Sequence, residues 1–180
     1  MEKIQKKFID PEKIISQLDI RQGNVVADFG CGTGYFSFPL AKKVGDKGTV
    51  YSLDVLPQII EAIESQAKLE NIKNIITKRV NFEKQDGSGL KEESLDWVIL
   101  KDVLYQNQDK EAIIQEAKRV LKNGGRILVV EWNEENLMIG PEKEIRVKKE
   151  SILELAKKIG LKFVTDIDAG DFNYGFVLIK

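Results

Sequence analysis

The feature that most constrains the fold is the segment 25–34, which reads VVADFGCGTG. It begins with an apolar run typical of a parallel strand that is buried on both faces. Gly30, Gly32 and Gly34 then interrupt the strand, and sequence that favours a helix resumes at Tyr35. Glycines reach positive φ without penalty and let a backbone approach a ligand closely. A strand, a glycine turn and a helix in this order are the opening of a mononucleotide-binding βαβ unit.

The spacing of the glycines distinguishes between classes of nucleotide ligand. A dinucleotide fingerprint places its third glycine at position 35, which is tyrosine here, whereas the third glycine of this chain is Gly34. Asp28 stands at the end of the strand, where its carboxylate repels a pyrophosphate and attracts a ligand with an amino or sulfonium group. The alternative interpretation is a tight turn that binds no ligand.

Two segments carry a family resemblance. Residues 28–34 (DFGCGTG) resemble the first motif of the class I S-adenosylmethionine-dependent methyltransferases, and residues 119–126 (RVLKNGGR), with the strand that follows, resemble a later signature. The chain is most similar to the small single-domain type of ubiquinone and menaquinone biosynthesis, and only residues 1–10 stay unmatched. The resemblance implies a Rossmann-like fold, S-adenosyl-L-methionine as cofactor and S-adenosyl-L-homocysteine as product.

Predicted helices and strands alternate along the chain, which favours a three-layer, doubly wound α/β sheet. The predicted helices span 11–18, 35–45, 56–71, 109–122 and 148–159, and the predicted strands span 25–29, 48–53, 75–80, 95–100, 127–131, 161–167 and 172–179. Asn123–Gly125 is expected to end the fourth helix. The last two strands are expected to close the mostly parallel sheet as an antiparallel C-terminal edge hairpin. The 180 residues predict a single domain, with 1–20 as an N-terminal arm and helix.

The candidate cofactor residues follow predicted strands, because ligands of such sheets bind outside the carboxyl ends of the strands. Asp54 stands where an acid can accept from both ribose hydroxyls, with helix N-capping as the alternative. Asn81 stands where the family usually has an acid that accepts from the adenine amino group, and its amide oxygen can still accept. The predicted cofactor site comprises Asp28, Gly30, Cys31, Gly32, Gly34, Asp54, Val55, Asn81, Phe82, Leu100 and Lys101.

The chain contains no histidine, so the commonest general base is absent. The candidates for accepting a proton are Asp102, Tyr105 and Glu131, unless the acceptor is already nucleophilic. Because methyl transfer depends chiefly on in-line geometry, positioning is predicted to be the main catalytic device. Lys101 is expected to contact the cofactor's carboxylate or an anionic acceptor. For Lys101 and Tyr105, the alternative is a solvated loop pair.

Four residues are predicted to bind the methyl acceptor: Phe8, Tyr105, Trp132 and Arg146. The segment from Trp132 to Arg146 contains the apolar run Leu137–Ile139, which suits a lid over an apolar or aromatic acceptor. A loop packed on the sheet, or one in a subunit interface, is the alternative for this segment.

The amino-acid composition limits the classes of binding partner that we expect. The 28 basic and 29 acidic residues nearly balance, which disfavours nucleic-acid binding, and the sheet leaves no appended domain to hold a macromolecule. A small-molecule acceptor is therefore predicted, with no metal, no membrane insertion, a cytoplasmic location and an open oligomeric state. Two other functions stay open. They are a non-catalytic module that binds the methyl donor, and a nicotinamide-dependent oxidoreductase, which Tyr35 and Asp28 disfavour.

Overall fold

The structure is a computed structural model and describes residues 7–134 and 139–180. Its elements in chain order are α1 (Pro11–Ser16), β1 (Val25–Phe29), α2 (Ser37–Val44), β2 (Thr49–Asp54), α3 (Pro57–Leu69), β3 (Ile75–Arg79), β4 (Leu95–Lys101), α4 (Lys110–Val120), β5 (Leu121–Trp132), the 3₁₀ helix η1 (Lys143–Ile145), α5 (Lys149–Lys158), β6 (Lys162–Ile167) and β7 (Asn173–Ile179).

Within the described residues, seven strands form one sheet in the order β3-β2-β1-β4-β5-β7-β6. The strands from β1 to β5 pair in parallel, and β7 pairs antiparallel with both β5 and β6. The predicted doubly wound α/β sheet and its antiparallel C-terminal hairpin are therefore confirmed. β7 is inserted between β5 and β6, so β6 is the edge strand.

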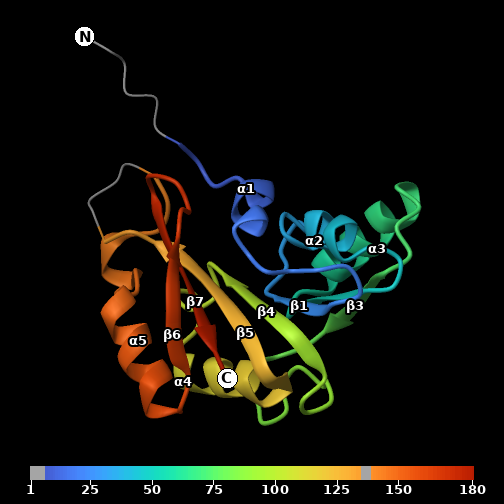
Figure 1. Cartoon of the computed structure of the whole chain (residues 1–180). Helices are drawn as coiled ribbons and strands as arrows, with labels where there is room; N and C mark the ends of the chain where they lie inside the picture. Colours follow the sequence, from blue (N-terminus) through green and yellow to red (C-terminus); the bar gives the residue numbers. More distant parts are fainter. Residues whose placement is uncertain (1–6, 135–138) are drawn as a thin grey trace.

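Helices cover both faces of the sheet, which gives the predicted three layers (Figure 1). α1, α2 and α3 lie on one face, and α4 and α5 lie on the other. This arrangement follows from right-handed crossovers, because the chain leaves β1 toward one edge and then returns to start β4 on the other side of β1. The return creates a switch point between β1 and β4.

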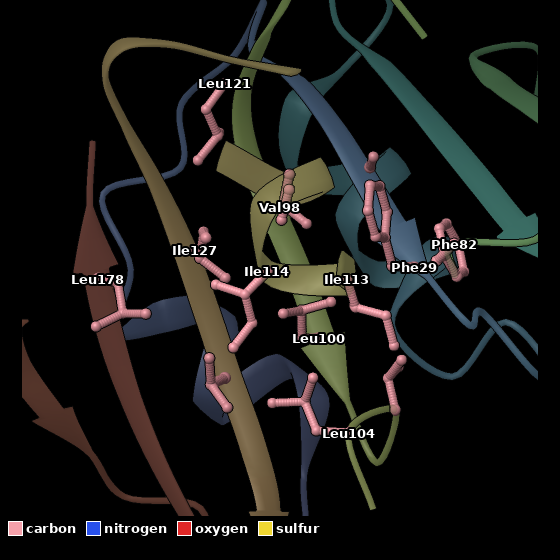
Figure 2. Packing of buried hydrophobic residues seen from close by; sticks show 14 of the residues in the cluster. Phe29, Phe82, Val98, Leu100, Leu104, Ile113, Ile114, Leu121, Ile127 and Leu178 are labelled. Atoms are coloured by element: carbon pink, nitrogen blue, oxygen red, sulfur yellow. The ribbon is translucent and has the colours of Figure 1, made fainter. Parts of the chain in front are cut away.

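Alternate residues of the central strands enter opposite apolar layers. Val98 and Leu100 of β4 pack with Ile113 and Ile114 of α4 in one layer, as Figure 2 shows. Ile99 of the same strand packs in the other layer, with residues of α1 and α2. A strand with both faces buried must be apolar at every position, which explains the continuous apolar runs in the sequence.

The fourth helix is shorter than predicted. It ends at Val120, and Leu121 already has an extended backbone with φ −72° and ψ 137°. Leu121 is fully buried and pairs with Leu95 of β4, so burial in the sheet competes successfully with continuation of the helix. The prediction that Asn123–Gly125 ends the helix is therefore wrong. This segment belongs to β5, where the pairing with β4 shifts register before Arg126.

The start of α1 follows its sequence signals. The side chain of Asp10 accepts hydrogen bonds from the backbone N–H groups of Glu12 and Lys13, at 3.1 and 3.2 Å, and Pro11 occupies the first helical position. In α2 the proline at position 39 lies in the first turn, where its missing N–H costs no helical hydrogen bond. These local signals fix where the helices that flank the glycine turn begin.

Candidate active site

A cavity of about 410 Å³ lies at the switch point, outside the carboxyl ends of β1, β2 and β4. Doubly wound sheets bind their ligands at this place. The residues of the cavity wall that the sequence predicted are Gly30, Gly32, Asp54, Val55, Asn81, Phe82 and Asp102. The fold thus gathers residues from four separate loops around one hollow.

A second hollow, of about 650 Å³, lies at the amino ends of β2 and β3. Its described walls come from 41–49 and 71–74 and include no residue of the predicted site. The hollow at the switch point is the candidate site, because the chemistry-bearing side chains converge there and not at the larger hollow.

The backbone amides of the glycine turn are bonded within the protein. Gly30 and Cys31 both donate to the carbonyl oxygen of Leu53, at 2.7 and 3.0 Å. The N–H of Gly32 donates to Oδ2 of Asp54 at 3.2 Å. A phosphate-binding turn keeps such amides for the anion. This turn instead uses them to fix its own shape beside the cavity.

Gly34 has a positive φ of 80°, and a Cβ there would lie 2.5 Å from side-chain atoms of both Ile63 and Phe38. No other residue fits without displacing the packing between the turn and α3. At Gly32 a Cβ would meet no atom within 4 Å, so this glycine faces open space. The thiol of Cys31, between Gly30 and Gly32, is buried, and burial raises its pKa.

Asp28 lies beneath the turn and is only 2% exposed. Its Oδ2 accepts a hydrogen bond from Oγ of Ser37 at 2.6 Å, and Oγ of Ser52 donates to Oγ of Ser37 at 2.8 Å. Burial raises the pKa of Asp28 to about 6, although the Ser37 hydrogen bond and the charge of Lys101 oppose the shift. Asp28 thus joins β1, α2 and β2 beneath the cavity and contributes to the electrostatic field there.

Asp54 does not N-cap α3, because the N-cap residue is Leu56 and no side chain caps this helix. Its Oδ1 accepts from the backbone N–H of Leu56 at 3.0 Å, and its Oδ2 accepts from Gly32. Each carboxylate oxygen has a further lone pair, and Asp54 lines the cavity. Val55 beside it is 50% exposed and also lines the cavity. The two backbone amides therefore orient the carboxylate and leave it able to accept from a ligand.

Asn81 and Phe82 follow β3 at the far wall of the cavity. Oδ1 of Asn81 accepts from the backbone N–H of Glu83 at 3.0 Å, so the predicted adenine contact would share this oxygen. The Phe82 ring is buried and stacks on Phe29, with the ring centroids 4.3 Å apart. Figure 2 shows these two rings side by side at the edge of the apolar layer. Leu100, also predicted, is fully buried, so its side chain belongs to the core.

Lys101 and Asp102 form an ion pair at the end of β4, between the lysine Nζ and Oδ2 of Asp102. The backbone N–H of Asp102 donates to the carbonyl of Val130 at 2.9 Å, so the residue stays attached to β5. Asp102 has a positive φ of 57°, an uncommon conformation for a residue other than glycine. Burial raises the pKa of Asp102, although the ion pair opposes the shift.

Glu131 is a buried acid beside Asp102. It is fully buried, and its Oε1 accepts from the backbone N–H of Leu104 at 2.7 Å. Burial raises its pKa to about 8, and the charge of Asp102 adds to the shift. Tyr105 is half-buried nearby, and burial together with Asp102 and Glu131 raises its pKa. The three predicted proton acceptors are thus brought together at the ends of β4 and β5.

Arg146, predicted to bind the acceptor, holds its own segment in place. Its guanidinium donates to the carbonyl oxygens of Asn133 at 2.8 Å, Ile139 at 3.0 Å and Pro141 at 2.8 Å. It also lies over the Trp132 ring, 5.9 Å from the centroid. These bonds give Arg146 a structural role in the segment 132–146. Leu137 and Met138, part of the predicted apolar run, lie outside the described residues.

Phe8 lies on an arm that crosses the same rim of the sheet. Its ring packs on Phe172 with a centroid separation of 5.0 Å, and it remains 69% exposed. Two hydrogen bonds hold one end of the arm: the Lys7 N–H donates to Oδ2 of Asp171, and the Asp171 N–H donates to the carbonyl of Lys7. The Tyr35 hydroxyl donates to the carbonyl of Ile9 at 2.7 Å. The arm therefore connects the glycine turn to the start of β7.

Six further residues of the wall were not predicted: Leu56, Ile59, Glu83, Val103, Gln106 and Asn107. Leu56 and Ile59 lie at the start of α3, directly after the predicted pair Asp54 and Val55. Gln106 donates from Nε2 to the carbonyl of Asp102 at 2.6 Å, and Asn107 donates from Nδ2 to the carbonyl of Val103 at 2.7 Å. These amides shape the loop after β4, which periodicity does not reveal.

None of the helices in the described parts of the chain is both long and apolar enough to cross a bilayer. Across 7–134 and 139–180, no group of three or more His, Cys, Asp or Glu side chains is placed to hold a metal ion.

Comparison with protein families gives a match over residues 20–167 to a methyltransferase domain. Demethylmenaquinone methyltransferase of Lactobacillus johnsonii is 26% identical over 125 residues, which cover 68% of this chain and 50% of that protein. The chain spans about half the length of the curated relatives that it matches.

Solved structures share the fold. An S-adenosylmethionine-dependent methyltransferase from Aquifex aeolicus superposes with a TM-score of 0.88 at 22% identity, covering 96% of this chain and 91% of that one. A type 11 methyltransferase from Sulfolobus solfataricus gives 0.80 at 21% identity, covering 97% and 94%. The match to the family model shows that the chain belongs to the methyltransferase domain family. Its fold is that of the solved S-adenosylmethionine-dependent methyltransferase from Aquifex aeolicus.

Proposed function

We propose that this protein transfers a methyl group from S-adenosylmethionine to a small-molecule acceptor. The observation that carries the proposal is the convergence of Asp54, the glycine turn and the loops after β3 and β4 on one cavity of about 410 Å³ at the switch point. The Asp54 carboxylate, held by Gly32 and Leu56, lines this cavity and would accept from the ribose hydroxyls, and Asn81 with Phe82 lines the same cavity after the next strand. This is the order in which ribose and adenine follow one another in the cofactor.

The same turn disfavours a nicotinamide dinucleotide. A pyrophosphate needs free backbone N–H groups at the turn. Here the amides of Gly30, Cys31 and Gly32 donate to Leu53 and Asp54, and the Asp28 carboxyl lies directly below. A cationic sulfonium and an ammonium group suit this acidic environment better than two phosphates do.

We further propose that the acceptor carries an aromatic ring. Four aromatic residues lie at the ends of β4 and β5 or before the start of β7: Tyr105, Trp132, Phe172 and Phe8, whose ring packs on Phe172 and remains largely exposed. Several curated relatives are called demethylmenaquinone methyltransferases, a name that denotes a quinone-type acceptor. A hydroquinone ring of this kind is therefore the first acceptor class to assay.

Methyl transfer requires mainly that the acceptor atom be aligned with the methyl–sulfur bond of the cofactor. The acceptor atom attacks the methyl carbon in line with the carbon–sulfur bond, the new bond forms as that bond breaks, and the electron pair returns to sulfur to give S-adenosylhomocysteine. Holding the two reactants in this geometry contributes up to about 7–11 kcal/mol to the rate. The rim segments at 7–10 and 132–134 and the loop 102–107 are the parts that would hold the acceptor.

Calorimetry with S-adenosylmethionine, S-adenosylhomocysteine and NAD⁺ tests the proposed cofactor. We expect both sulfur compounds to bind and NAD⁺ to bind at least about tenfold more weakly, a difference of about 1.4 kcal/mol. Transfer of radiolabelled methyl groups to hydroquinones, or to the small-molecule fraction of a cell extract, then tests catalysis. Tight cofactor binding with no labelled product from any fraction would indicate a non-catalytic binding module.

A further inference from the structure

The start of β5 contains an asparagine followed by a glycine, Asn123 and Gly124, the one such pair in the 180 residues. Asparagine is among the chemically labile residues, and glycine has no Cβ to keep its backbone nitrogen away from a neighbouring side chain. Both residues are exposed, and they lie at the opposite end of the sheet from the cofactor cavity. The proposed methyl transfer makes no use of this pair.

The side chain of Asn123 is free to change its rotamer, because it makes no hydrogen bond within residues 7–134 and 139–180. Gly124 has a positive φ of 77°, and a Cβ there would meet no atom within 4 Å. The space around the pair is therefore open. The side chain of Asn123 can turn so that its amide carbon approaches the backbone nitrogen of Gly124.

Backbone hydrogen bonds restrain this nitrogen. The N–H of Gly124 donates to the carbonyl of Lys180 at 3.2 Å, and the N–H of Lys180 donates to the carbonyl of Gly125 at 3.0 Å. The Lys180 ammonium also donates to the carbonyl of Leu121 at 2.6 Å, which fixes Lys180 beside the start of β5 (Figure 1). The nitrogen of Gly124 must leave its bond to Lys180 before it can attack a neighbouring carbon.

We propose that Asn123 is a site of spontaneous deamidation and that the pairing of Gly124 with Lys180 sets the rate of this modification. The reaction proceeds when the chain after β7 separates locally from β5, since the ends of strands open at a lower free energy than the whole fold. The product that affects the fold is isoaspartate, which lengthens the backbone of β5 at position 123.

The reaction balances with water as its only co-reactant. The nitrogen of Gly124 loses its proton to solvent and attacks Cγ of Asn123, and the side-chain nitrogen takes a proton from solvent and leaves as ammonia. The resulting cyclic imide contains a new bond between Cγ and the nitrogen of Gly124. Water then adds to one of the imide carbonyl carbons, and the bond from that carbon to nitrogen breaks. Cleavage at Cγ gives aspartate, and cleavage at the backbone carbonyl carbon gives isoaspartate.

A negative charge at position 123 is tolerated by the surroundings. Asn123 lines a hollow of about 260 Å³ together with three basic and two acidic side chains, which are Arg21, Lys122, Arg126, Asp19 and Asp96. One further carboxylate makes the basic and acidic groups equal in number, so electrostatic repulsion is small.

Isoaspartate has a different effect, because it adds a main-chain carbon to β5. It does so where β5 pairs with β4 and where the ladder already shifts register between Leu95 and Trp97. The extra carbon also displaces Gly124 from its partner Lys180. We therefore expect isoaspartate, but not aspartate, to destabilise the fold.

The first experiment compares rates of deamidation. Wild-type protein and a variant without Lys180 are incubated at mildly alkaline pH, with and without denaturant, and peptides that contain position 123 are quantified by mass spectrometry. Folded wild-type protein is expected to react at least about tenfold more slowly than the unfolded chain, and removal of Lys180 to accelerate the folded protein by about threefold or more. In denaturant the two proteins should react at equal rates.

Gly124→Ala is the matched control for the chemistry. It keeps Asn123 and places a methyl group beside the reacting nitrogen, in a position where a Cβ meets no other atom. This variant should therefore deamidate more slowly than wild-type protein in denaturant, where differences in folding play no part.

The second experiment measures fold stability. Aged wild-type protein is fractionated by chromatography, and fragmentation in the mass spectrometer distinguishes isoaspartate from aspartate. The isoaspartate fraction should unfold at a lower denaturant concentration than fresh protein. Asn123→Asp, which carries the charge on an unaltered backbone, should unfold at the same concentration as fresh protein.

Four outcomes overturn the proposal. They are equal rates in the folded and the unfolded wild-type protein, no acceleration on removal of Lys180, an isoaspartate fraction as stable as fresh protein, or equal destabilisation by isoaspartate and by Asn123→Asp. None of these outcomes depends on the proposed methyl transfer, so the two proposals are tested separately.

Discussion

At the scale of the residue, the site depends on side chains that stabilise the local backbone and also line the cavity. Asp54 is the clearest example, because Gly32 and Leu56 orient its carboxylate before any cofactor arrives. Such pre-orientation lowers the entropy lost on binding. The same carboxylate oxygens therefore stabilise the local backbone and are available to bind the cofactor.

Asp54→Ala is expected to weaken S-adenosylmethionine binding by about 1.5–3 kcal/mol, the range for a hydrogen bond to a charged group. Calorimetry measures the change, and Asp46→Ala, which removes an exposed acid far from the cavity, serves as the control. Part of the loss will come from the turn itself, which loses the Gly32 contact, so thermal unfolding should be measured in parallel. Unchanged affinity would show that Asp54 only holds the local backbone.

Asn81→Asp is expected to tighten cofactor binding modestly. An aspartate can keep the contact with the Glu83 N–H and offers a charged acceptor to the adenine amino group in place of a neutral one. The dissociation constant for S-adenosylmethionine provides the measurement. An affinity equal to that of the wild type would mean that the side chain at position 81 does not contact the adenine.

At the scale of the element, the segment that follows β5 is held from within. Arg146 bonds to three backbone carbonyls of this segment and lies over Trp132. A Cβ at Gly140 would lie 2.6 Å from the same indole ring, so the chain packs closely on it. The rest of this segment therefore packs around the Trp132 ring.

Trp132→Ala should impair methyl transfer far more than cofactor binding. We expect the rate with a hydroquinone acceptor to fall by about tenfold or more, while the affinity for S-adenosylhomocysteine changes by less than about threefold. Radiolabel transfer and calorimetry measure the two quantities. If both fall by the same factor, Trp132 supports the cofactor side of the cavity or the fold as a whole.

At the scale of the whole molecule, buried acids couple the fold to pH. The pKa of Glu131 is raised to about 8 and that of Asp28 to about 6, so the folded protein holds protons that the unfolded chain releases at lower pH. These two carboxyls contribute fully to folding stability at pH values below the ordinary carboxyl pKa. Their contribution is lost as pH rises through their raised pKa values. This contribution favours folding at mildly acidic pH.

Glu131→Gln should reduce the dependence of folding stability on pH. The amide oxygen can still accept from Leu104, but position 131 no longer titrates. Wild-type protein is expected to lose several kcal/mol from this group between about pH 5 and 8, since each pKa unit corresponds to about 1.4 kcal/mol. Denaturant unfolding across this range measures the slope. Parallel slopes in the two proteins would show that Glu131 is not protonated in the folded state.

The prediction from sequence succeeded where short-range patterns carry the information. The apolar run of β1, the three glycines and the Asp10-Pro11 pair each determine local backbone geometry, and the structure has them as predicted. It failed at the junction of α4 and β5. There Asn123–Gly125 resembles a helix end, but a contact between Leu121 and Leu95, distant in the sequence, decides the outcome.

The sequence by itself determined the alternation of strands and helices and the glycine turn, because apolar periodicity and turn chemistry act between neighbours in the chain. It also selected the acids that follow the strands. Only the tertiary structure decided what those side chains contact. It bonded Arg146 to backbone carbonyls and Asp28 to Ser37, and it buried Asp102 in an ion pair with Lys101. Burial and partnership depend on which segments pack together, and no local pattern contains that information.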